Sequence, residues 1–98
     1  MELTARFEDA QARSKKLAKT PDTDDLLALY ALFKQGSLGD ATGARPGMMD
    51  FKGRAKFDAW SGKKGMAKDA AMTAYVALVD KLAGLRARPR IDGGSRLR

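Results

Sequence analysis

Apolar side chains recur every three or four residues over most of this chain, which is the spacing of one face of an α-helix. The clearest row lies on one side of a predicted helix over residues 66–86: Met72, Tyr75, Val76, Val79, Leu82 and Leu85. A second row follows the break at Lys19–Asp22: Leu26, Leu29, Tyr30 and Phe33. We therefore predict a long helix over each segment, the second ending where Gly36 and Gly39 weaken the pattern.

Two further helices complete the pattern. One covers residues 3–17, where the row is Leu3, Phe7, Ala10, Ser14 and Leu17. The other is short and runs from a cap at Asp50 through about residue 62, with Phe51, Ala55 and Ala59 on one stripe. Aspartates suited to N-capping stand before two of the four helices, at Asp22 and Asp50. Because no run of residues has the alternation of a strand, the sequence predicts an all-α bundle.

The longest stretch without helical periodicity before the C-terminal tail is residues 39–50, GDATGARPGMMD. It contains three glycines and a proline. Loops of about twelve residues without regular structure are uncommon and are usually functional or disordered. This loop is therefore a candidate functional segment.

The positive charge is concentrated at the C-terminus. Residues 86–98 hold five arginines against one aspartate, which places +4 of the formal net charge of +7 there. Residues 1–85 hold 14 basic residues against 11 acidic ones, a balance of only +3. We therefore predict a mildly basic folded domain over residues 1–86. A basic, disordered tail is predicted over residues 87–98, where proline, glycine and arginine replace the apolar row.

The composition excludes most catalytic sites. The chain has no cysteine and no histidine, which removes disulfides, thiolate metal ligands and the usual general base near neutral pH. Its helical carboxylates, such as Asp58, Asp69 and Asp80, are spread out rather than clustered. We therefore expect no enzymatic activity, no metal and no cofactor. Because the sequence has neither a membrane-spanning run nor a signal-peptide core, we expect a soluble, cytoplasmic monomer.

Basic and aromatic residues share helix faces in this chain. Tyr30 and Lys34 are four residues apart, as are Lys52 and Lys56, and Lys56 and Trp60. One interpretation places the aromatic rings in the core and the lysines in solvent. The other is a surface for a ligand that is both anionic and apolar. Spacing alone leaves both open, and it leaves two readings for Met48 and Met49, gap-filling side chains or an adaptable apolar wall.

Three segments, LYALFKQGSLGD, RPGMMDFKGRAKFDAW and GMAKDAAMTAYVALVDKL, occur in an order and at a spacing that closely resemble the acyl-CoA-binding protein family. The resemblance covers roughly residues 3–86. It implies an up-down-down-up four-helix bundle that binds, buffers and transports medium- and long-chain acyl-CoA esters without reacting with them.

The resemblance also implies a ligand site. Tyr30 is expected at the adenine and 3′-phosphate end, with Lys34 and Lys56 supplying positive charge. Leu27 is the expected wall for the acyl chain. The remaining implied site residues are Lys15, Phe33 and Tyr75.

The sequence departs from the family pattern at three positions. Phe33 stands where the family usually has a tyrosine, and Phe57 stands where it commonly has a tryptophan. Ala67 replaces an expected capping serine. The first departure removes a hydroxyl from the implied head-group site. The lost cap is expected to weaken the start of the fourth helix.

Two non-enzymatic alternatives compete with ligand transport. The first is a polyanion-binding protein that uses the arginine-rich tail to meet nucleic acid or an anionic membrane surface. The tail has no aromatic residue for base stacking, which argues against nucleic acid. The second is an interaction protein that keeps the fold and has lost the ligand. The presence of Tyr30, Lys34 and Lys56 argues against that interpretation.

Overall fold

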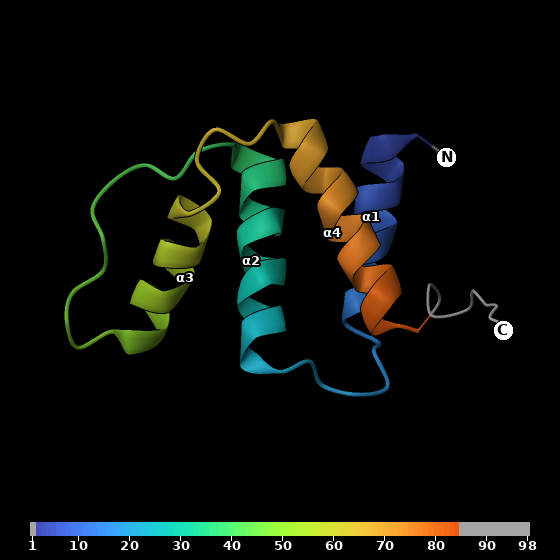
Figure 1. Cartoon of the computed structure of the whole chain (residues 1–98), viewed down its shortest axis with the longest axis horizontal. Coiled ribbons are helices and arrows are strands. Elements are labelled where there is room, and N and C mark those ends of the chain that lie inside the picture. The colour runs from blue at the N-terminus through green and yellow to red at the C-terminus, as the bar shows by residue number, and fades with distance from the viewer. Residues whose placement is uncertain (1, 85–98) are drawn as a thin grey trace, which may run out of the picture.

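The computed structural model describes residues 2–84. These residues form four helices: α1 (Leu3–Ser14), α2 (Thr23–Leu38), α3 (Phe51–Ser61) and α4 (Lys68–Leu82) (Figure 1). Residues 2–84 contain no strand, and the predicted all-α class is confirmed. The predicted boundary between a domain over residues 1–86 and a tail over residues 87–98 lies outside the described residues.

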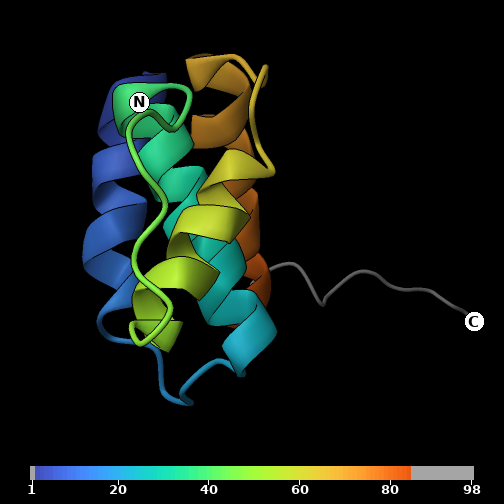
Figure 2. The same cartoon turned by 90° about the vertical axis from the view of Figure 1, so that its left-hand side faces the viewer.

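The helices stand in the spatial order α3, α2, α4, α1 (Figure 1). Helix α2 packs against both α3 and α4, and α4 packs against α1. Helices α2 and α3 run in one direction and α1 and α4 in the other, so the up-down-down-up topology is confirmed (Figures 1 and 2). The loop between α2 and α3 runs along the outer face of this pair (Figure 2).

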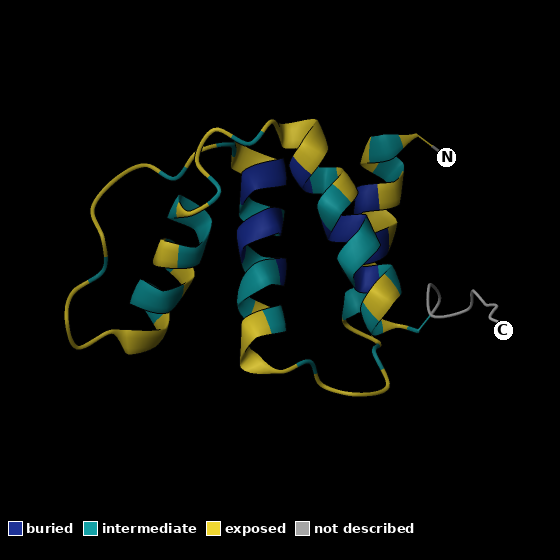
Figure 3. Cartoon of the chain, in the orientation of Figure 1, coloured by how far each residue is buried: buried dark blue, intermediate teal, exposed yellow. Residues whose placement is uncertain are grey.

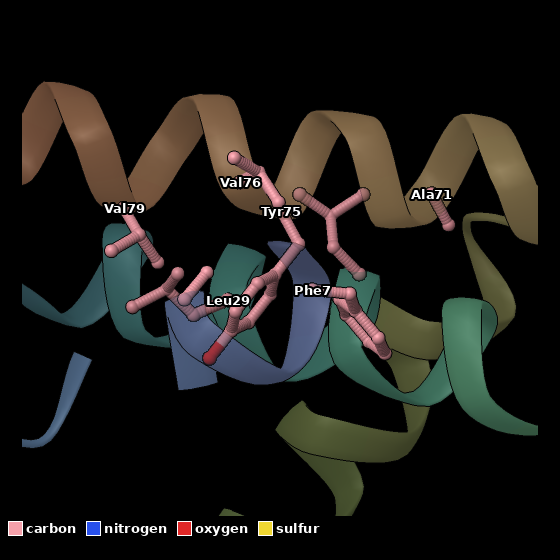
Figure 4. Close-up of a cluster of buried hydrophobic side chains, with 8 residues drawn as sticks. Phe7, Leu29, Ala71, Tyr75, Val76 and Val79 are labelled. Atoms are coloured by element: carbon pink, nitrogen blue, oxygen red, sulfur yellow. The ribbon is translucent and has the colours of Figure 1, made fainter. Parts of the chain in front are cut away.

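The hydrophobic core lies among α1, α2 and α4 (Figure 4). Its buried members are Phe7, Ala10, Leu29, Leu32, Ala71, Tyr75, Val76 and Val79. Tyr75 reaches from α4 into the space between α1 and α2, where its ring meets Phe7 edge-on at a centroid distance of 5.2 Å (Figure 4). Every residue of α3 is described, and none of them is buried (Figure 3). The core therefore holds three helices, and α3 is added at the side of α2.

Both predicted aspartate caps are present. The carboxylate of Asp22 accepts a hydrogen bond from the Asp25 amide at 2.9 Å, and that of Asp50 accepts one from the Gly53 amide at 2.9 Å. Ala67 gives α4 no side-chain cap, as the sequence predicted.

Two helices are shorter than predicted. Helix α1 ends at Ser14 rather than at residue 17, because the Lys15 and Lys16 amides turn back to the carbonyls of Ala12 and Arg13. The Ser14 hydroxyl also donates to the Gln11 carbonyl at 2.7 Å, which supports this tight last turn.

Helix α4 begins at Lys68 and ends at Leu82, inside the predicted range of 66–86. Gly65 and Gly84 flank it with φ of +91° and +82°, a backbone conformation that favours glycine and stops a helix. Leu85 of the predicted row lies outside the described residues.

Two members of the predicted apolar stripes are exposed. Phe51 is 75% exposed and Leu26 is 46% exposed. Both lie in the first turn of their helices, where Figure 3 shows exposed residues on α2 and α3. Helical spacing gives the side of a helix and does not show where along that side the neighbouring helix stops.

Candidate ligand-binding site

Two lysines and two aromatic rings meet between α2 and α3. The Lys34 ammonium lies 5.8 Å from the Tyr30 ring centroid and 5.5 Å from that of Trp60 on α3. The Lys56 ammonium, also on α3, lies 5.4 Å from the Tyr30 centroid. Each distance falls within the range of a cation–π interaction, which contributes about 0.5–1 kcal/mol at exposed sites. We call Tyr30, Lys34, Lys56 and Trp60 the lysine–aromatic cluster.

The two ammonium groups of this cluster form none of the ion pairs found within residues 2–84. Those pairs join Arg13 to Asp9 and Asp80, and Arg45 to Asp58. Two positive charges beside one ring repel each other, and an anion placed between them would relieve that repulsion. The cluster is therefore suited to a group that carries concentrated negative charge, such as a phosphate.

An apolar hollow of about 360 Å³ adjoins the cluster between α2 and α3. Its walls are Thr23, Leu26, Leu27, Lys52, Ala55 and Lys56. Lys56 belongs both to this wall and to the cluster. Positive charge and apolar surface therefore adjoin each other along the α2–α3 groove.

A second hollow of about 220 Å³ lies between α1, α2 and α4. Its walls are Gln11, Ser14, Lys15, Phe33 and Tyr75. Tyr75 is only 5% exposed, and its hydroxyl donates to the Ser14 hydroxyl oxygen at 3.3 Å. The Phe33 ring centroid lies 6.4 Å from that of Tyr75. Lys15 is the exposed cation at this hollow.

The structure thus separates the predicted site residues into two groups. Leu27, Tyr30, Lys34 and Lys56 lie at the α2–α3 groove, whereas Lys15, Phe33 and Tyr75 lie at the second hollow. Helix α2 carries members of both groups and so connects them. Met48 and Met49 occupy neither of their predicted places, because they are 76% and 88% exposed and lie outside the walls of the hollow.

A polar network holds the two loops at the end of α2. Gln35 is fully buried, and its Nε2 donates to the Asp40 carboxylate at 2.8 Å and to the Met66 carbonyl at 2.9 Å. The same oxygen of Asp40 accepts a hydrogen bond from the Gly65 amide at 2.9 Å. The Gly65 and Gln35 hydrogen bonds, with a smaller contribution from Lys64, lower the pKa of Asp40. We call Gln35, Asp40, Gly65 and Met66 the polar knot.

The polar knot is joined to the lysine–aromatic cluster through Trp60. The indole N–H of Trp60 donates to the Gly39 carbonyl at 2.8 Å, and Gly39 immediately precedes Asp40. Gly39 has φ +85° and ψ −152°, which a residue with a Cβ rarely adopts. This turn of the backbone therefore fixes the ring that lies beside Lys34.

The long loop is attached to α3 by a two-pronged ion pair. Arg45 donates to both carboxylate oxygens of Asp58, at 2.9 and 2.7 Å. The Arg45 hydrogen bond lowers the pKa of Asp58, and the same contact raises the pKa of Arg45. The loop thus has defined anchors at Arg45 and at the Asp50 cap.

Sequence reasoning missed the structural role of Gln35 and the wall position of Lys52. Gln35 follows Leu32 by three residues and Leu29 by six, which places a polar side chain on the buried face of α2. That signal was available in the sequence. Lys52 gave no comparable signal, because its place in the wall depends on how α3 lies against α2.

The part of the chain that the structure describes has neither a metal site nor a membrane-spanning helix. No group of three or more acidic side chains there is arranged to hold a metal ion. No helix in that part is long and apolar enough to cross a membrane.

Comparisons with known proteins identify the family. Residues 4–79 match the family model described as Acyl CoA binding protein. The chain is 58% identical over 80 residues to Acyl-CoA-binding protein homolog 1 of Caenorhabditis elegans, covering 82% of this chain and 93% of that protein. It is 51% identical over 83 residues to the Acyl-CoA-binding protein homolog of Manduca sexta, with coverage of 84% and 92%.

Solved structures agree with this match. The crystal structure of Oryza sativa Acyl-CoA-Binding Protein 2 has a TM-score of 0.81 and 36% identity, covering 88% of this chain and 94% of that one. The structure of ACBP from Moniliophthora perniciosa has a TM-score of 0.76 at 37% identity, with coverage of 84% and 80%. The names of these proteins describe binding proteins rather than enzymes, in agreement with the non-enzymatic prediction. The chain belongs to the acyl-CoA-binding protein family.

Proposed function

We propose that this chain binds medium- and long-chain acyl-CoA esters without reacting with them, and that it buffers and transports them as a cytoplasmic monomer. The observation that carries the proposal is the double position of Lys56, in the lysine–aromatic cluster and in the wall of the apolar hollow. An acyl-CoA joins a polyphosphate and an adenine to a hydrocarbon chain. A site with adjoining cationic, aromatic and apolar surfaces matches that combination.

The head group is assigned to the cluster. In this proposal Tyr30 packs its ring on adenine, while Lys34 and Lys56 form charge-assisted hydrogen bonds with phosphate oxygens. Binding replaces repulsion between two ammonium groups with attraction to a shared anion. Phe33 offers ring contact from the neighbouring hollow and lacks a hydroxyl to donate.

The acyl chain is assigned to the hollow between α2 and α3. Leu27 forms its wall, opposite Ala55 of α3. Each methylene that leaves water contributes about 0.8 kcal/mol, offset in part by the conformational entropy that a flexible chain loses when it is held. Lys15 and Tyr75 extend the ligand surface across α2 in this proposal, Lys15 as a cation and Tyr75 as part of the wall of the second hollow.

Calorimetric titration with a long-chain acyl-CoA, free CoA and the matching fatty acid tests the proposal. The ester is expected to bind far more tightly than either half, because each half leaves one part of the site empty. In a series of esters, affinity is expected to rise with chain length and then level off when the chain outgrows the hollow. A flat series with free CoA as tight as the longest ester would reduce the site to a phosphate patch and reject the proposal.

A further inference from the structure

Three exposed apolar side chains lie close together in the sequence where the long loop meets α3. Met48, Met49 and Phe51 are 76%, 88% and 75% exposed, and they fall within four consecutive residues. We call these three residues the apolar lip. Exposed apolar groups scattered singly are normal on a protein surface, whereas a contiguous set marks an interaction site more often.

The backbone under the apolar lip is held by local hydrogen bonds. The Asp50 amide donates to the Gly47 carbonyl at 3.0 Å, and the Asp50 carboxylate caps the Gly53 amide. A Cβ at position 53 would make that carboxylate shift, so glycine leaves room for the cap in its present position. The lip is therefore presented on a defined turn at the start of α3, at the end of the molecule where Figure 3 shows exposed residues on both α2 and α3.

The lip borders the apolar hollow. Phe51 is followed directly by Lys52, which lines the hollow, and the half-exposed Leu26 lines it from the α2 side. Lys52 is exposed and forms none of the ion pairs within residues 2–84. An apolar edge with a neighbouring ammonium matches the boundary of a phospholipid layer, where acyl chains meet phosphates.

A second copy of the chain fits this surface less well. Three side chains of this size bury roughly 500 Å² at most, whereas a stable protein–protein interface needs about 800 Å² from each partner. Insertion into a lipid interface requires no matching surface of that extent. We propose that the apolar lip docks the protein on the interface of a phospholipid bilayer, with Lys52 against the lipid phosphates. Docking needs no bound ligand, and its use in ester exchange rests on the proposed function.

The charges near the lip define which lipids it suits. Asp24 is exposed in the first turn of α2, at the same end of the molecule as the lip, and an anionic membrane would repel it. The neighbouring Asp22 carboxylate is turned to the Asp25 amide. Asp50 also lies within the lip segment, but its carboxylate is turned to the Gly53 amide. Apolar insertion with a lysine–phosphate contact therefore favours a zwitterionic surface. Such a surface has little net charge, so it attracts the arginine-rich tail only weakly.

Co-flotation with vesicles of pure phosphatidylcholine tests the docking surface, using the ligand-free full chain. The double variant Met49→Ser/Phe51→Ser is expected to lower the bound fraction at least about tenfold, because it removes two of the three inserting side chains. Leu38→Ser is the matched control, because Leu38 is 60% exposed and lies at the opposite end of α2. Lys52→Gln is expected to give a smaller loss, with Lys81→Gln on α4 as its control.

Solution measurements on the same proteins separate the alternatives. For Met49→Ser/Phe51→Ser and for Leu38→Ser, docking predicts unchanged affinity for a long-chain ester in vesicle-free buffer and an unchanged monomer mass in light scattering. A fall in ester affinity would assign the lip to the ligand site, and a dimer lost in the double variant would assign it to a second copy. Either result, or equal vesicle binding by the double variant and wild type, would overturn the proposal. Wild type that binds vesicles but no ester would overturn the proposed function alone.

Discussion

The two lysines of the cluster reach the same ring from different helices, so they are expected to act on the ligand together. Lys34→Met and Lys56→Met should each weaken ester binding roughly ten- to a hundredfold, since a hydrogen bond to a charged group contributes about 1.5–3 kcal/mol. Titration calorimetry at several salt concentrations measures this loss, and each variant should also show a shallower salt dependence. Lys19→Met, which removes an exposed lysine between α1 and α2, is the charge-matched control. An equal loss in that control would mean that only the net charge matters.

Trp60 is expected to act on the ligand through Lys34. Trp60→Phe keeps a ring beside the ammonium and loses the hydrogen bond to Gly39, while Trp60→Leu loses both. Ester affinity should fall severalfold in the leucine variant and less in the phenylalanine variant, because a cation–π contact contributes about 0.5–1 kcal/mol. A double-mutant cycle with Lys34→Met checks the route. If the leucine change costs as much affinity without Lys34 as with it, Trp60 acts by another path.

At the scale of elements, the polar knot makes the contact between the two loops depend on pH. The pKa of Asp40 is lower in the folded protein than its unfolded value of about 3.9. Its stabilisation is therefore fully present above that unfolded value and is lost as pH falls through the folded value. Denaturant unfolding of wild type and Asp40→Asn across acidic pH should show a stability difference that shrinks as pH falls.

Glu8→Gln, on the exposed side of α1, is the control for a general loss of negative charge. A difference between wild type and Asp40→Asn that stays constant down to the lowest pH would show that the Asp40 charge does not hold the knot. In that case the neutral hydrogen bonds of Gln35 would be what stabilises the polar knot.

Periodicity and helix caps predicted the four helices because both depend on residues that are close together in the sequence. The caps at Asp22 and Asp50 were predicted correctly for the same reason. Periodicity failed where a helix end depends on a tight turn, as at Ser14, or where burial depends on a distant neighbour, as for Phe51. The pairing of Tyr30 with Lys34 follows from their spacing. That of Tyr30 with Lys56 depends on how α3 lies on α2, which no local pattern contains.

For the whole molecule, the ligand surface and the basic tail are expected to act independently. Deleting residues 87–98 should leave ester affinity within about twofold, because surface changes away from special features usually have small effects. The same deletion removes four arginines, and it should weaken binding to anionic vesicles or nucleic acid wherever that binding depends on them. Calorimetry with ester measures the first expected result, and co-flotation with anionic vesicles measures the second. A large loss of ester affinity would instead place the tail over the site.

The lateral position of α3 has a consequence for how the molecule opens. Within residues 2–84, α2 is the one helix that α3 packs against, and α3 buries none of its own residues, yet it carries Lys56 and Trp60. Such an element detaches at a lower free energy than the core does. Amide hydrogens of α3 are therefore expected to exchange with deuterium faster than those of α4 in the free protein. A ligand that spans α2 and α3 adds contacts to the side of α3 that faces α2. Saturating the protein with ligand should therefore slow amide exchange in α3 more than in the other helices.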